Sequence, residues 1–112
     1  MKYLAIIYAA ETNTQPTPEE MQLWFDFNEK NKNYITAGEA LMPTKTATSL
    51  SNVSGKMIVS DGPFAETKEA LGGFYMLDCK DLEEAIEVAK QIPSTKYGTV
   101  EVRPIMEIPD SA

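Results

Sequence analysis

The residue types best suited to acid–base chemistry gather between Asp61 and Tyr75, where the chain reads DGPFAETKEALGGFY. We call residues 61–75 the polar segment. A carboxylate can serve as a general acid or base when partial burial raises its pKa toward neutrality. Asp61, which opens this segment, and Glu39, which precedes it, are therefore the two predicted catalytic residues.

Four further side chains complete a predicted substrate-binding set. Arg103 and Lys68 are cations that can hold an anionic group, and a guanidinium can grip a carboxylate in a bidentate manner. Tyr75 can donate a hydrogen bond or orient a ring, and Glu66 adds another carboxylate to the polar segment. Together these groups suit acid–base chemistry on a small organic acid, such as an isomerisation or an elimination.

The same residues also have a purely structural interpretation. Asp61-Gly62-Pro63 is typical of a turn, and residues 66–69 can form a single helical turn. Arg103 would then pair with Asp61 or Glu66 to anchor the polar segment to the sheet, and such an exposed pair is worth about 1 kcal/mol or less. The sequence leaves both interpretations open.

Histidine is absent from the chain, and Cys79 is its only cysteine. The lack of histidine excludes Ser-His-Asp and Cys-His catalysis and the usual His-rich transition-metal sites. A lone cysteine forms no intrachain disulfide, so we expect a reducing cytoplasm, and its apolar neighbours predict a small buried hydrophobe. No spacing of carboxylates requires Mg²⁺ or Ca²⁺, and we expect neither a metal nor a cofactor.

Charge and hydropathy narrow the range of partners. Seventeen acidic against ten basic residues give a net charge of −7, the wrong sign for nucleic-acid phosphates or an anionic membrane. No apolar run approaches the roughly 20 residues of a membrane helix, and the run 3–10 lacks a good signal-peptide cleavage site. We therefore expect one domain over residues 1–112 that binds neither nucleic acid nor membrane.

Alternation and capping signals divide the chain into elements. We expect strands at residues 2–9, 46–53, 56–60, 73–79 and 99–106, a turn followed by a strand within 34–41, and helices at 18–33 and 82–92. Thr17 and Glu20 predict a capping box before the first helix, whose apolar face includes Trp24 and Phe25. Ser54-Gly55 predicts the turn of a hairpin, which we expect to be peripheral.

Two strand–helix–strand halves with an inserted hairpin predict an α+β fold, the ferredoxin-like βαβ–βαβ sandwich, with both helices on one face of an antiparallel sheet. The strands at 2–9 and 73–79 are apolar on both faces, although the helices cover only one. A homodimer packed sheet on sheet would cover the other face. We expect a small-molecule ligand in a pocket between the sheet and the polar segment.

The polar segment resembles the signature of the DGPF family, which is part of the YCII-related proteins. The matching residues are DGPFAETKE at 61–69 and LGGFY at 71–75, with KYL at 2–4, AGEAL at 37–41, IP at 92–93 and VEVRPIM at 100–106. The similarity covers nearly the whole chain. It implies a dimeric α+β barrel of ferredoxin-like subunits, and it brings no established activity because most members are uncharacterised bacterial proteins.

One departure from the family pattern bears on the chemistry. Other YCII-like proteins have a His on the first helix and an Asp before the Pro that follows the second helix, and these are suspected to be a catalytic pair. Met21 and Ile92 stand at approximately these positions, so that chemistry does not carry over. DGPF-like domains are also associated with bacterial sigma-factor systems, which implies an alternative function as a non-enzymatic interaction or regulatory module.

Overall fold

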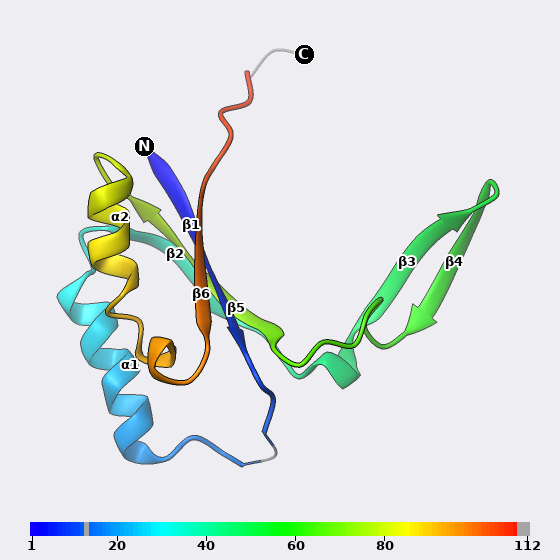
Figure 1. Ribbon diagram of the computed structural model, residues 1–112, viewed down its shortest axis with the longest axis horizontal. Helices are drawn as coiled ribbons and strands as arrows, with labels where there is room; N and C mark the ends of the chain where they lie inside the picture. Colours follow the sequence, from blue (N-terminus) through cyan, green and yellow to red (C-terminus); the bar gives the residue numbers. More distant parts are fainter. Residues whose placement is uncertain (13, 110–112) are drawn as a thin grey trace.

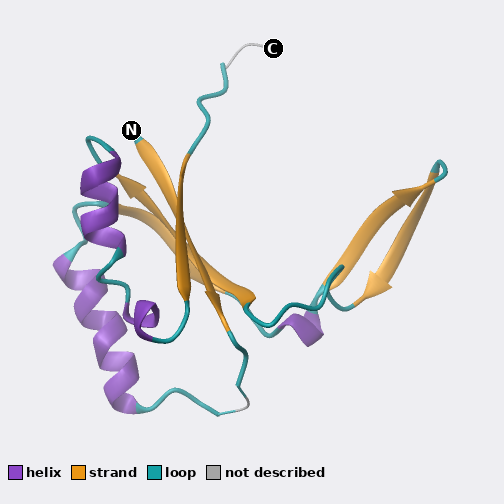
Figure 2. Cartoon of the chain, viewed as in Figure 1, coloured by secondary structure: helices purple, strands orange, loops and turns teal. Residues whose placement is uncertain are grey.

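The computed structural model describes residues 1–12 and 14–109, which form a four-stranded antiparallel sheet and a separate two-stranded hairpin (Figure 1). The strands are β1 (Lys2–Ala9), β2 (Ile35–Ala40), β3 (Thr48–Val53), β4 (Lys56–Asp61), β5 (Ala70–Asp78) and β6 (Thr99–Pro104). The helices are α1 (Pro18–Lys30) and α2 (Leu82–Ala89), with short 3-10 turns η1 (Thr44–Thr46) and η2 (Pro93–Lys96). The sheet order is β2-β5-β1-β6, and both helices lie on the same side of it (Figure 2). This is the predicted ferredoxin-like arrangement with an inserted hairpin.

Side-chain caps set the limits of α1. Thr17 is the predicted N-cap, and its Oγ1 accepts a hydrogen bond of 3.2 Å from the backbone N–H of Glu20. The helix ends at Lys30, earlier than predicted, because Asn31 caps it by donating from Nδ2 to the carbonyl of Phe27 at 3.1 Å. Within the described residues, no helix is both long enough and apolar enough to cross a membrane.

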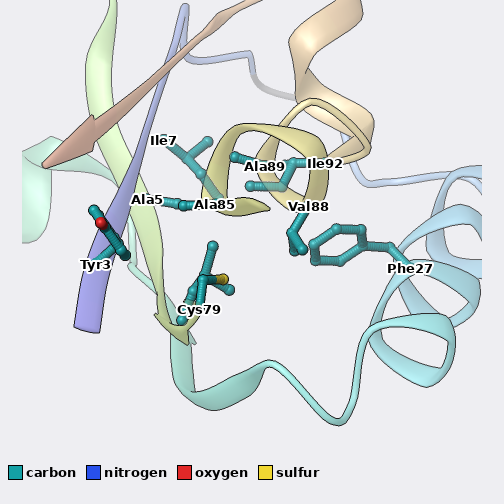
Figure 3. Packing of buried hydrophobic residues seen from close by; sticks show 10 residues of the cluster. Tyr3, Ala5, Ile7, Phe27, Cys79, Ala85, Val88, Ala89 and Ile92 are labelled. Atoms are coloured by element: carbon teal, nitrogen blue, oxygen red, sulfur yellow. The ribbon is translucent and has the colours of Figure 1, made fainter. Parts of the chain in front are cut away.

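The core lies between the sheet and the two helices (Figure 3). Its buried members are Tyr3, Ala5, Ile7, Phe27, Leu77, Cys79, Ala85, Val88, Ala89 and Ile92. Alternate residues of β1 supply one side of this core, as the period of a strand requires. On α2, Ala85 and Ala89 present only methyl groups to the core, so the helix can approach the sheet closely.

Two apolar residues that the sequence predicts to pack inward differ in their burial. Phe25 was expected on the packed face of α1, but it is exposed, because successive residues of a helix point about 100° apart and Trp24 and Phe27 take the inward direction. Cys79 is buried as predicted. Burial, reinforced by the nearby carboxylates of Glu84 and Asp78, raises the pKa of its thiol, so the side chain is a protonated hydrophobe at neutral pH.

The second face of the sheet is also apolar, and no helix covers it. Leu4 and Ile6 of β1 lie beside Met76 and Phe74 of β5, and all four are only half-buried. We call these residues, with their neighbours on the same side, the open face. The register of β6 places Arg103 beside Leu4 on this face. The predicted two-faced character of the central strands is therefore confirmed.

The last strand is shorter than predicted. It was expected to reach Met106 but ends at Pro104, and Met106 is exposed. Pro104 pairs with Tyr3 and the N–H of Ile105 donates to the carbonyl of Lys2, so the ladder has reached the beginning of β1. No further residues of β1 remain to pair with Met106.

Strands β3 and β4 form an arm that stands away from the body of the molecule (Figure 1). The predicted turn is present, because Ser54 and Gly55 both have positive φ values, 52° and 83°. The arm is peripheral, as expected. The following residues, 62–69, form an irregular loop and not the helical turn that the structural interpretation considered.

Candidate functional site

A cavity of about 640 Å³ lies between α1 and the strands β2 and β5. Its walls are mainly apolar and aromatic, with contributions from Trp24, Met21, Ile7, Phe74 and Tyr75. Every residue of β2 borders it, as expected where the outer edge of an edge strand forms a wall. Small-molecule sites are typically concave and apolar with a few polar groups, so this cavity is the candidate site.

A second depression of about 560 Å³ lies beside α2. Its lining is rich in charged side chains, among them Lys80, Asp81, Glu83 and Glu84. The acidic residues among them are ordinarily solvated at a helix N-terminus and favourable to the helix dipole, so this depression needs no ligand to explain it. Within residues 1–12 and 14–109, no group of three or more His, Cys, Asp or Glu side chains is arranged to hold a metal ion.

Tyr75 is the best-positioned polar side chain of the cavity. Its ring lies 5.1 Å from that of Phe27 in an edge-to-face arrangement and 6.3 Å from that of Trp24. Its hydroxyl donates a hydrogen bond of 2.7 Å to Asn28 Oδ1. Burial raises the pKa of Tyr75, while the Asn28 bond opposes this rise, so Tyr75 is a neutral hydrogen-bonding group at physiological pH.

Gly38 makes room for the Tyr75 ring. The two residues are neighbours across β2 and β5, and a Cβ at position 38 would lie 2.6 Å from Tyr75 Cδ1. A separation this short is a steric clash. A residue without a side chain is therefore needed at this point of β2, directly beside the cavity.

Ser94 contributes a polar group that sequence reasoning missed. It lies in η2, lines the cavity and is only 2% exposed. Its Oγ is the one buried side-chain oxygen or nitrogen without a hydrogen-bond partner in the part of the chain that the structure describes. Its carbonyl accepts bonds from the N–H groups of Tyr97 and Gly98. No local sequence signal marks Ser94, because its burial depends on packing between distant elements.

Two of the predicted site residues border the cavity. Tyr75 faces the helices, whereas Glu39 pairs with Phe74, so its side chain belongs to the open face although its strand forms the cavity wall. Met21, the approximate counterpart of the family's histidine, also lines the cavity. Ile92, the counterpart of the aspartate, is fully buried in the core.

The other four predicted residues lie elsewhere in the single chain. Asp61 ends β4 at the root of the arm, Glu66 and Lys68 are exposed in the loop that follows, and Arg103 is on the open face of β6. One chain thus brings the side chain of Tyr75 and the backbone of Glu39 to the cavity, but not these four residues. A catalytic or binding role for the six stays a prediction.

Hydrogen bonds anchor the polar segment, rather than the ion pairs considered from the sequence. Among the described residues, Arg103 forms a salt bridge with neither Asp61 nor Glu66. Instead, Ser49 Oγ donates to the carbonyl of Gly62 at 2.7 Å, and Thr99 Oγ1 donates to Glu69 Oε1 at 2.9 Å. These two hydrogen bonds fix the ends of the loop 62–69, one to β3 and the other to β6.

Comparison with known proteins agrees with this architecture. A solved structure of 5-chloro-2-hydroxyhydroquinone dehydrochlorinase from Burkholderia phenoliruptrix AC1100, in complex with 2,5-dihydroxybenzoquinone, superposes with a TM-score of 0.58 at 15% identity, covering 95% of this chain and 94% of the other. An uncharacterised protein of Rhizobium meliloti (strain 1021) is 39% identical over 94% of this chain and 92% of its own length. The family model of the YCII-related domain matches residues 1–109. With a family match over nearly all of the described residues and a relative similar throughout its length, the chain belongs to the YCII-related family.

Proposed function

We propose that the protein binds a small organic molecule in the cavity between α1 and the β2–β5 edge. The observation that carries this proposal is the buried Ser94 hydroxyl, which lines an apolar cavity and has no hydrogen-bond partner among the described residues. An unpaired buried hydroxyl costs about 1–3 kcal/mol. A hydroxyl or carbonyl group of a ligand can satisfy Ser94, because its Oγ can move between staggered rotamers.

The charges around the cavity favour an uncharged ligand. No Lys or Arg lines it among the described residues, and Glu39 is the one ionisable carboxylate that borders it. A carboxylate that entered would lose hydration without meeting a cation, at a cost of several kcal/mol. A ring with hydroxyl or carbonyl groups therefore fits this cavity better than the small organic acid suggested by the cations of the polar segment.

The ligand class can be tested with two matched compounds. We expect millimolar hydroquinone to raise the melting temperature and 4-hydroxybenzoate, its anionic counterpart, to have a much smaller effect. Ser94→Ala should weaken hydroquinone binding by roughly 3- to 10-fold, the value of one hydrogen bond, without lowering the stability of the free protein. Binding is measured by thermal shift and titration calorimetry.

Ser51→Ala, at an exposed serine of the arm, is the matched control and should bind as the wild type does. Equal binding of the two compounds would contradict an uncharged ligand. Unchanged binding in Ser94→Ala would remove Ser94 from the site, and the absence of any shift with either compound would contradict the cavity as the binding site.

We also propose acid–base chemistry on a small organic acid at a separate place, the open face of the sheet, which carries the side chains of Glu39 and Arg103. Glu39 or Asp61 would act as general acid or base, and Arg103, Lys68 and Glu66 would hold the polar end of a substrate. The likeness of the fold to a dehydrochlorinase supports an enzyme only as an analogy. A single chain does not bring these residues together, so the chemistry requires a second copy of the chain. The proposal therefore includes a homodimer that forms through the open face. We place this homodimer in the cytoplasm.

Solvent exchange tests the acid–base chemistry directly. In D₂O, the wild type should accelerate exchange of the α-hydrogens of a 2-oxo acid, followed by NMR, because a general base abstracts such protons. Asp61→Asn or Glu39→Gln should slow this exchange by roughly 100-fold or more. Glu19→Gln, at an exposed position of α1, is the control. Exchange at the buffer rate in the wild type would favour the non-enzymatic interaction module, which the exposed apolar surface of the arm also supports.

A further inference from the structure

The arm carries an apolar surface that no other part of residues 1–12 and 14–109 covers. β3 and β4 pair only with each other, and every residue of β4 is exposed. Their register puts Leu50 beside Val59 and Asn52 beside Met57. Leu50, Val59 and Met57 therefore share one face of the arm, where they are 65%, 63% and 61% exposed. We call this the arm face.

Asp61 lies on the same face of the arm. It follows Met57 and Val59 at the two-residue period of a strand and pairs with Thr48 near the root. Its carboxylate forms no salt bridge within the described residues. The arm face thus combines an apolar patch with one unpaired negative charge at its inner end.

An arm of this kind is not stable by itself. An isolated two-stranded hairpin is at best marginally stable in water. The chain is also more extended than a compact domain, with a radius of gyration of 16.4 Å against the roughly 13 Å expected for its length. Both observations indicate that the arm packs against another molecule.

The open face of the sheet is the complementary surface on the same chain. It presents a half-buried apolar centre of Leu4, Ile6, Phe74 and Met76, with Arg103 at its β6 margin. Arg103 forms no salt bridge among the described residues. One chain therefore offers two apolar surfaces of its own, each with an unpaired charge of opposite sign, which is the pattern of a self-complementary contact.

We propose, taking the homodimer of the proposed function as the starting point, that the arm of each copy docks on the other copy. The two open faces pack together at their centres, and the arm face of each copy lies along the β6 margin of the other. This places Asp61 of one copy against Arg103 of the second copy. The contact completes the burial of the arm face and joins two predicted site residues that a single chain keeps apart.

Substitutions on opposite faces of the arm test the docking. Leu50→Asp with Val59→Asp places two charges in the contact, whereas Ser51→Asp places the same type of charge on the other face of the arm. By light scattering at micromolar concentration, the wild type and Ser51→Asp should be dimers and the double variant a monomer with unchanged circular dichroism. A double variant that remains a dimer would overturn the docking of the arm and leave the proposed homodimer standing, whereas a monomeric wild type would overturn both.

Charge reversal tests the pairing of Asp61 with Arg103. Asp61→Arg and Arg103→Asp should each weaken dimerisation by roughly fivefold, the upper value for an exposed ion pair, and the combined variant should restore it. Dissociation constants from analytical ultracentrifugation at low salt provide the measurement. Failure of the combined variant to recover would overturn the pairing.

Discussion

Leu77→Ala is expected to lower the free energy of unfolding by about 2–5 kcal/mol, the largest effect of any single change considered for this protein. Leu77 is fully buried at the centre of the sheet, where it pairs with Tyr3 of β1 and Ile35 of β2. Truncation removes buried methyl groups and leaves a cavity that the surrounding strands cannot close. A loss of this size is a large fraction of the roughly 5–15 kcal/mol that stabilises a typical domain.

Leu71→Ala provides the matched control. It makes the same chemical change on the same strand, but Leu71 is 45% exposed and should lose much less stability. Urea unfolding gives both values at one fixed protein concentration, because the homodimer proposed above would make the free energy of unfolding depend on concentration. An equal loss in the free energy of unfolding in the two variants would contradict the burial of Leu77 in the core.

The sequence predicts the fold well because its signals are local. The aromatic and β-branched residues of β1 identify the strand to its observed limits, Lys2–Ala9, and Thr17 caps α1 through the predicted hydrogen bond. Strand ends that depend on a distant partner are predicted less well. The end of β6 is the example, because it is determined by where β1 begins.

The candidate site depends on contacts between residues that are far apart in the chain, and such contacts leave no local pattern in the sequence. Tyr75 was named for its chemistry, but its bond to Asn28 joins β5 to α1 across 47 positions. Ser94 was missed because its burial arises from the packing of η2 against other elements. The polar segment matches a family signature. In a single chain, however, its charged residues near the arm are exposed. Its residue types predict chemistry, but a single chain does not bring these side chains together.

Gly38→Ala is expected to destabilise the protein by about 1–3 kcal/mol and to weaken binding of hydroquinone in the cavity. The new Cβ would lie 2.6 Å from Tyr75 Cδ1 and 2.9 Å from Cε1. The Tyr75 ring cannot easily retreat, because Trp24 and Phe27 pack against it. A displaced ring would lengthen or break the hydrogen bond to Asn28 and change the shape of the cavity wall.

Gly72→Ala separates this clash from the general effect of replacing glycine in a strand. Gly72 also borders the cavity, but its added Cβ would be 4.0 Å from the nearest atom, the carbonyl oxygen of Ile7, which is an ordinary contact. It should therefore be tolerated. In a Tyr75→Ala background, Gly38→Ala should lose most of its cost, since the ring it collides with is gone. If Gly38→Ala were as harmless as Gly72→Ala in the wild type, the packing of Tyr75 on Gly38 would not be the feature that shapes the cavity.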